Sequence, residues 1–130
     1  MNLQSPSCRV NKDAESLFQF LSTPENYQKL MPQNTERFEV LGEDSFLFQL
    51  KGMPEIQLEI QEKKPFEKIK LGSLGGKLPF TLILEIDSKG ENQSEAQFLF
   101  EGQFNAMMGM MVKKPIQKFI DMLSENLSEI

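Results

Sequence analysis

Alternation of apolar and polar residues through the middle of the chain constrains its fold most. Apolar side chains stand at every second position in six segments between residues 37 and 104. In the clearest segment, single polar residues separate Ile56, Leu58 and Ile60. Because successive side chains of a β-strand point to opposite faces, a period of two predicts strands with one apolar face and one solvent-exposed face.

Turn residues separate these segments and determine how they connect. Glycine, proline, aspartate or asparagine occurs in each of the intervals 42–44, 63–66, 74–79 and 88–93. Intervals this short join antiparallel neighbours, because a parallel pair needs a crossover of a dozen or more residues. The glycines of 74–79 superficially resemble a phosphate loop, but their spacing favours a hairpin turn. The expected strands form an antiparallel meander at 37–40, 46–50, 55–61, 68–73, 80–87 and 95–104.

The C-terminal segment is expected to cover the apolar face of this sheet. Its apolar residues recur at helical spacing at Val112, Ile116, Phe119, Ile120, Leu123 and Leu127. A stripe of that width predicts a helix that packs against a core. Pro115 lacks an amide donor, so it either starts this helix or kinks one that begins near Met107. We favour the kinked helix.

The first part of the chain has a different pattern. We expect a strand at Ser7–Asn11 and then a short helix within Asn11–Ser22, which Asp13 caps. A second short helix is expected within Thr23–Pro32, because Pro24 suits the first helical position. The predicted order is one strand, two short helices, six strands and one long helix.

The composition excludes several classes of function. With 19 acidic and 14 basic residues the net charge is −5, which disfavours nucleic acid because phosphate binding needs clustered Lys and Arg. The chain has no histidine, so no Ser-His-Asp or Cys-His catalytic arrangement can form within it. Cys8 is the single cysteine, which leaves no Cys/His metal site and no internal disulfide. We therefore expect no metal and no cofactor.

Length and segment composition bound the organisation and the location. The 130 residues suit one domain, residues 1–130. No segment reaches the run of about 18 apolar residues that a membrane span requires, so we expect no membrane insertion. Residues 1–10 lack a basic region followed by an apolar stretch, so they do not form a secretory signal. Together with the lone cysteine, this predicts a cytoplasmic protein.

Two stretches carry a resemblance that covers essentially the whole chain. RVNKDAESLFQFLSTPENYQKLMP, residues 9–32, and FEGQFNAMMGMMVKKPIQKFIDML, residues 100–123, resemble the START-related, birch-pollen-allergen-like superfamily. This group, also called SRPBCC, includes polyketide cyclases, dehydrases and lipid transport proteins. The resemblance implies an α+β helix-grip fold, in which a strongly curved antiparallel sheet of about seven strands wraps around the long C-terminal helix. It also implies a cavity between the sheet and that helix, small in so short a chain.

A hydrophobic small molecule is the ligand that such a cavity suits. The inward residues expected to line the cavity are Phe20, Phe48, Leu58, Leu71, Phe80, Leu82, Phe98, Phe100, Met107, Met108, Met111 and Phe119. Four methionines within residues 107–111 favour an adaptable apolar wall, or simply a filled core. Asn26, Tyr27 and Asn105 are the polar groups expected nearest the opening, where they orient a ligand or only cap helices and satisfy the backbone.

The residue pattern favours a binder over an enzyme. Members of the superfamily that catalyse reactions place ionisable groups in the cavity. The acidic residues of the expected strands alternate with the inward apolar positions and therefore face outward; these are Glu39, Glu59, Glu85 and Glu101. No pair of titratable groups in contrasting environments is evident, so we name no catalytic residue. We expect non-catalytic binding or transport of a lipid-like molecule. The alternatives are a cyclase-like or hydrolase-like enzyme, a protein-interaction or co-chaperone-like module that uses the methionine-rich end, and a homodimer through a strand edge.

Overall fold

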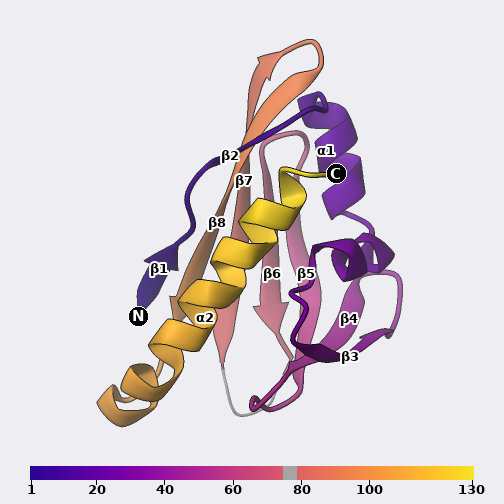
Figure 1. Cartoon of the computed structure of the whole chain (residues 1–130). Helices are drawn as coiled ribbons and strands as arrows, with labels where there is room; N and C mark the ends of the chain where they lie inside the picture. Colours follow the sequence, from indigo (N-terminus) through magenta and orange to yellow (C-terminus); the bar gives the residue numbers. More distant parts are fainter. Residues whose placement is uncertain (75–78) are drawn as a thin grey trace.

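The computed structural model describes residues 1–74 and 79–130 (Figure 1). The strands are β1 (Asn2–Gln4), β2 (Cys8–Val10), β3 (Thr35–Val40), β4 (Ser45–Leu50), β5 (Ile56–Lys64), β6 (Lys68–Ser73), β7 (Phe80–Gly90) and β8 (Gln93–Gly102). The helices are α1 (Ala14–Leu21), the 3₁₀-helix η1 (Pro24–Leu30) and α2 (Ala106–Leu127). The hairpin turn predicted at 74–79 lies largely outside the described residues.

The strands form one curved antiparallel sheet, which confirms the predicted α+β helix-grip arrangement. The strand order is β1-β8-β7-β6-β5-β4-β3, and β2 also pairs with β8. Opposite residues on its inner face are apolar, as in the pairs Leu82–Phe100 and Leu84–Phe98. The described residues contribute eight strands where about seven were expected. The extra strand is β1, which escaped prediction because Leu3 is its only apolar residue.

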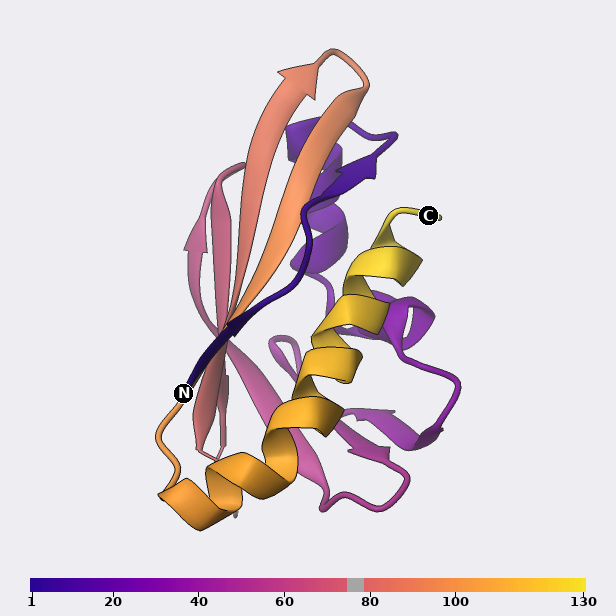
Figure 2. The same cartoon turned by 60° about the vertical axis from the view of Figure 1, so that its left-hand side comes forward.

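Helix α2 crosses the concave face of the sheet and closes the core (Figure 2). Its predicted apolar stripe is confirmed, because Val112, Ile116, Phe119, Ile120, Leu123 and Leu127 are all buried. The helix runs through Pro115 without ending, as favoured from the sequence. Since proline has no amide proton, the carbonyl of Met111 lacks its helical partner there. The first turns of α2 lie at an angle to the remaining turns (Figure 2).

The two N-terminal helices close the other end of the space under the sheet. Asp13 caps α1 as predicted, and its side chain accepts a hydrogen bond from the Ser16 amide at 2.7 Å. The second helix, η1, has 3₁₀ geometry and packs against α2, where Asn126 Nδ2 donates to the Leu30 carbonyl at 2.8 Å. Within the described ranges, no helix is both long and apolar enough to cross a membrane.

Candidate ligand-binding groove

An apolar groove opens beside α2 at Pro115. The loop that follows β4 forms one wall, α2 forms the other, and the segment after η1 closes one end. The groove has a volume of about 370 Å³ and is lined by Pro32, Asn34, Leu50, Lys51, Gly52, Met53, Lys114, Pro115, Lys118, Phe119 and Met122. Its size lies within the range of small-molecule sites in proteins, and its walls are mainly apolar.

A small apolar void lies behind this groove, between α2 and the sheet. It has a volume of about 20 Å³ and is lined by Phe48, Leu50, Met53, Ile56, Phe80, Phe100, Pro115, Ile116 and Phe119. The groove and the void share four lining residues, which are Leu50, Met53, Pro115 and Phe119. The Phe119 ring stacks on Phe48 with a centroid distance of 5.1 Å, and both rings line the void.

Three lysines surround the groove. Lys51, Lys114 and Lys118 are exposed, and none of them forms an ion pair with another described residue. The described lining contains no aspartate or glutamate. Three like charges around an apolar surface create a positive potential at the opening, which favours an anionic group there. The groove can therefore hold a molecule that has an apolar body and an acidic end.

The sequence-predicted cavity residues fall into two groups on the sheet and α2. Phe48, Phe80, Phe100 and Phe119 line the small void. The others are fully buried core residues that line neither space; they are Leu58, Leu71, Leu82 and Phe98. The space between the sheet and α2 is therefore mostly filled by core side chains, and the void is its small open remainder.

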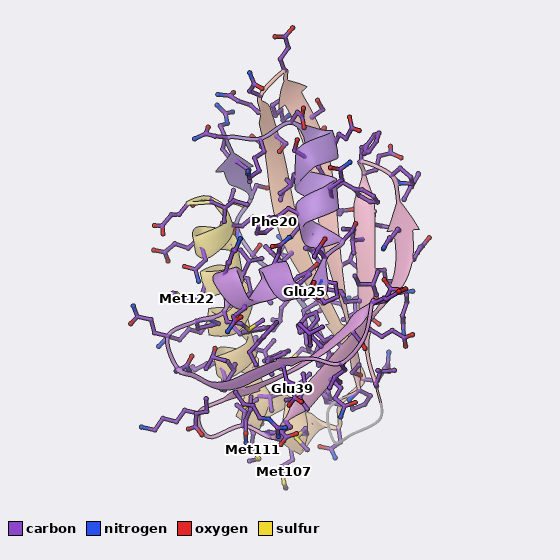
Figure 3. All side chains as sticks on the ribbon, turned by 90° about the vertical axis from the view of Figure 1, so that its right-hand side faces the viewer. Phe20, Glu25, Glu39, Met107, Met111 and Met122 are labelled. Carbon is purple, nitrogen blue, oxygen red and sulfur yellow. The ribbon has the colours of Figure 1, made fainter. Side chains whose placement is uncertain are left out.

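The methionines of α2 require a correction. Met107 and Met111 do not line a cavity, because they are 75% and 69% exposed and lie at one extreme end of the molecule (Figure 3). Met108 is half-buried and packs against the core. The first turns of α2 extend past the sheet, so the sheet offers no surface to cover these side chains (Figure 2).

Phe20 is also misplaced by the sequence-based expectation. It is half-buried on α1 and lines neither the groove nor the void. Lys29 Nζ lies 5.8 Å from the centre of its ring, in a cation–π contact. The helical stripe of α1 instead buries Leu17 and Leu21, which turns Phe20 toward η1 rather than toward the sheet.

The three predicted polar contacts all satisfy backbone groups, which was the alternative left open. Asn26 Nδ2 donates to the Phe20 carbonyl at 3.0 Å, and the Asn105 side chain caps α2 by accepting from the Met108 amide at 2.7 Å. The Tyr27 hydroxyl donates to the Leu21 carbonyl at 2.6 Å. Tyr27 is fully buried, and this burial raises the pKa of its hydroxyl far above the ordinary value.

The strand acids and Cys8, which are the ionisable groups considered from the sequence, do not line the groove. The strand acids Glu39, Glu85 and Glu101 are exposed and Glu59 is half-buried, as their parity predicted. Cys8 is buried, and this burial raises the pKa of its thiol, which leaves it a poor nucleophile. No cluster of three or more His, Cys, Asp or Glu side chains suited to a metal occurs in the part of the chain that the structure describes.

Sequence reasoning missed the groove-lining residues outside the strands. Met53 and Met122 were not singled out, and the lysines of α2 were not assigned to a site. The signal that could have found them is Pro115, because a proline within an amphipathic helix marks a bend where neighbouring elements cannot pack closely.

A second hollow of about 540 Å³ is lined mainly by outward-facing residues of the sheet. Its charged residues are Lys64, Glu67, Lys68, Glu85, Asp87 and Glu95. Charges of both signs line it together with few apolar groups, so it lacks the character of a site for an apolar ligand.

Comparisons with known proteins support the fold. The sequence matches no protein-family model, and no significant match to a curated protein was found. The structure is similar to a START superfamily protein from Mycobacterium smegmatis, with a TM-score of 0.77, 15% identity and coverage of 98% of this chain and 94% of the other. It is also similar to a conserved protein from Geobacillus kaustophilus, with a TM-score of 0.72, 15% identity and coverage of 99% and 93%.

An enzyme shares the same architecture. Norcoclaurine synthase from Thalictrum flavum, solved in complex with dopamine and hydroxybenzaldehyde, matches with a TM-score of 0.71 and 12% identity. The match covers 99% of this chain and 87% of the enzyme. At these identities the likeness shows the fold alone, a helix-grip fold shared with these proteins. A fold of this kind does not determine function, which depends on the residues of the groove.

Proposed function

We propose that this chain binds a hydrophobic or amphipathic, lipid-like small molecule without transforming it. The ligand's apolar part lies in the groove at Pro115, and its acidic end faces Lys51, Lys114 and Lys118. The observation that carries the proposal is that the apolar groove lies against the void behind it, since the two spaces share the lining residues Leu50, Met53, Pro115 and Phe119.

Hydrophobic burial supplies the affinity in this proposal. Each buried methylene group of a ligand contributes roughly 0.8 kcal/mol, so a chain of several carbons offsets the cost of association. Met53 and Met122 are flexible and polarisable, and they can adjust to ligands of different shape. Displacement of the Phe119 side chain would join the void to the groove and lengthen the site.

The lysines supply specificity. An exposed cation next to an apolar surface contributes modestly, about 0.2–1 kcal/mol for each pair with an anion, and salt screens the contribution. Among the described residues that line the groove, the titratable ones are all lysines, so these residues offer cations but no acid–base pair. A non-catalytic role is therefore the one that the described lining supports.

Paired ligands test the proposal. A fatty acid and the fatty alcohol of the same chain length differ only in charge at one end, and their dissociation constants can be measured by isothermal titration calorimetry. We expect the acid to bind several-fold more tightly at low salt, and high salt to reduce this preference. Lys118→Gln should reduce it too, whereas Lys12→Gln, outside the groove, should not. Failure of both ligands to bind, or equal affinity for both at low salt, would contradict the proposal.

A further inference from the structure

The first turns of α2 expose an apolar surface. Met107, Met110 and Met111 are 75%, 83% and 69% exposed, whereas Met108 packs against the core. At about 100° per residue, the three exposed methionines fall within the same 100° sector of the helix as Lys114 and Lys118. We call these five residues together with Lys113 the Met–Lys end.

The local charge of this end is opposite to that of the whole chain. Residues 106–120 contain Lys113, Lys114 and Lys118 and no acidic residue, while the chain carries a net charge of −5. None of these three lysines is paired with an acidic side chain among the described residues. An anionic partner is therefore attracted here and repelled by most of the remaining surface.

The position of the Met–Lys end favours contact with a flat surface. The first turns of α2 project from the body of the molecule (Figure 2), and Met107 and Met111 occupy its extreme end (Figure 3). A plane that touches this end meets the methionines first and then Lys114 and Lys118 along the same helix face, with Lys113 beside them. Apolar side chains next to lysines are the composition of segments that lie in the headgroup region of a bilayer.

We propose that the Met–Lys end docks onto the surface of an anionic lipid bilayer. Met107, Met110 and Met111 enter between the headgroups, and the lysines contact lipid phosphates and carboxylates. The chain lies on the bilayer and does not span it. Docking goes beyond the proposed ligand binding and does not require it. Lys114 and Lys118 also line the groove, so the opening of the groove would face the lipid in the docked state.

Charge disfavours a second copy of the chain as the occupant. A symmetric contact between two copies through this face brings the lysines of one against the same lysines of the other. Neither copy offers acidic residues there to neutralise them, since residues 106–120 carry none. A bilayer that contains anionic lipid supplies the complementary charge over a whole plane.

Vesicle binding tests the proposal. The full chain is centrifuged with phosphatidylcholine vesicles and with vesicles that also contain phosphatidylserine, at low and high salt. We expect partition into the anionic vesicles only, with loss at high salt. Lys113→Gln should weaken partition roughly fivefold, because one basic residue at an anionic surface is lost. Lys113 lies outside the groove, so ligand affinity should be unchanged and the two proposals are separable.

Matched variants identify the surface. The triple variant Met107→Gln, Met110→Gln and Met111→Gln should reduce partition more than tenfold. Leu41→Gln alters another exposed apolar residue, and Lys12→Gln another lysine; neither should change partition. All of these side chains are at least partly exposed, so circular dichroism should show the fold unchanged.

Oxidation of methionine gives an independent readout. Hydrogen peroxide converts accessible methionines to sulfoxides, which mass spectrometry locates. Anionic vesicles should slow oxidation of Met107, Met110 and Met111, and phosphatidylcholine vesicles should not. Absence of binding to anionic vesicles at low salt, or binding that the triple variant retains in full, would overturn the proposal. Self-association lost in the triple variant, without vesicle binding, would identify a second copy as the occupant and equally overturn it.

Discussion

Substitution of Phe119 by alanine tests the arrangement of groove and void most directly. Phe119 is 7% exposed, stacks on Phe48, and forms part of the wall between the two spaces. Loss of its buried ring removes about 2 kcal/mol of transfer free energy. Each 50 Å³ of void left behind adds about 1.2 kcal/mol. The free energy of unfolding should therefore fall by about 3 kcal/mol.

The matched control is Phe98→Ala. Phe98 is fully buried on β8 and lines neither the groove nor the void. Its loss creates a closed cavity, whereas the space left by Phe119 opens into the groove. We expect Phe98→Ala to lower the free energy of unfolding by about 4–5 kcal/mol, toward the upper end for this type of change.

Urea unfolding and ligand titration decide the outcome. The free energies of unfolding come from urea curves followed by circular dichroism, with the slope checked for two-state behaviour. Phe119→Ala should also bind a fatty acid more tightly than the unaltered chain, and Phe98→Ala should not. The reasoning fails if Phe119→Ala costs as much as Phe98→Ala and leaves ligand affinity unchanged, since Phe119 would then be an ordinary closed core residue.

Three further predictions follow from single side chains. Tyr27→Phe removes the donor to the buried Leu21 carbonyl, so the free energy of unfolding should fall by about 1–2 kcal/mol in urea. The pKa of Tyr27 is raised in the folded chain, so the contribution of Tyr27 to the free energy of unfolding is full below pH 10, the ordinary pKa, and declines above it. Tyrosinate absorbance should therefore rise only together with unfolding. A rise near pH 10 in the folded chain would contradict the burial of Tyr27. Gly109 lies within α2, and no atom lies close to the Cβ that Gly109→Ala would add. This substitution should raise the free energy of unfolding by about 0.5–1 kcal/mol, as measured by thermal unfolding. No gain would mean that the first turns of α2 are not helical. The Ser16 amide lowers the pKa of Asp13, so this cap stabilises the fold above pH 3.8, the ordinary pKa, and its contribution is lost as the pH falls below that value. In Asp13→Ala the free energy of unfolding should therefore fall less steeply on acidification than in Glu15→Ala.

The fold was predictable because its signals are periodic. Alternation fixed the inner face of each strand from β3 to β8, and the stripe from Val112 to Leu127 identified the helix that covers it. Both patterns arise from burial, and burial governs most of this structure. β1 lacked such a pattern, since it pairs with β8 through its backbone and has a single apolar side chain, Leu3, packed against the core.

The candidate site was predictable only in part. Parity shows that Phe48, Phe80 and Phe100 point inward, but not whether rings fill the space or leave it open. Met107 and Met111 were expected to line the cavity at the end of the helix where it opens. In the structure the first turns of α2 extend past the sheet, and both side chains are exposed. How far a helix extends past the sheet that it covers depends on the assembled fold. The local sequence pattern of the helix does not indicate it.

The pairing of β2 with β8 has a consequence for how the chain folds. From β3 to β8 each strand pairs with its sequence neighbour, and such local pairs form quickly because little chain entropy is lost. Cys8, by contrast, pairs with Ala96, so this contact closes a loop of most of the chain and should form late. Until then the outer edge of β8 is open to other molecules. Refolding yield should therefore fall with increasing protein concentration. Protection of the Cys8 and Val10 amides from hydrogen exchange should report when β2 has paired with β8 and covered this edge.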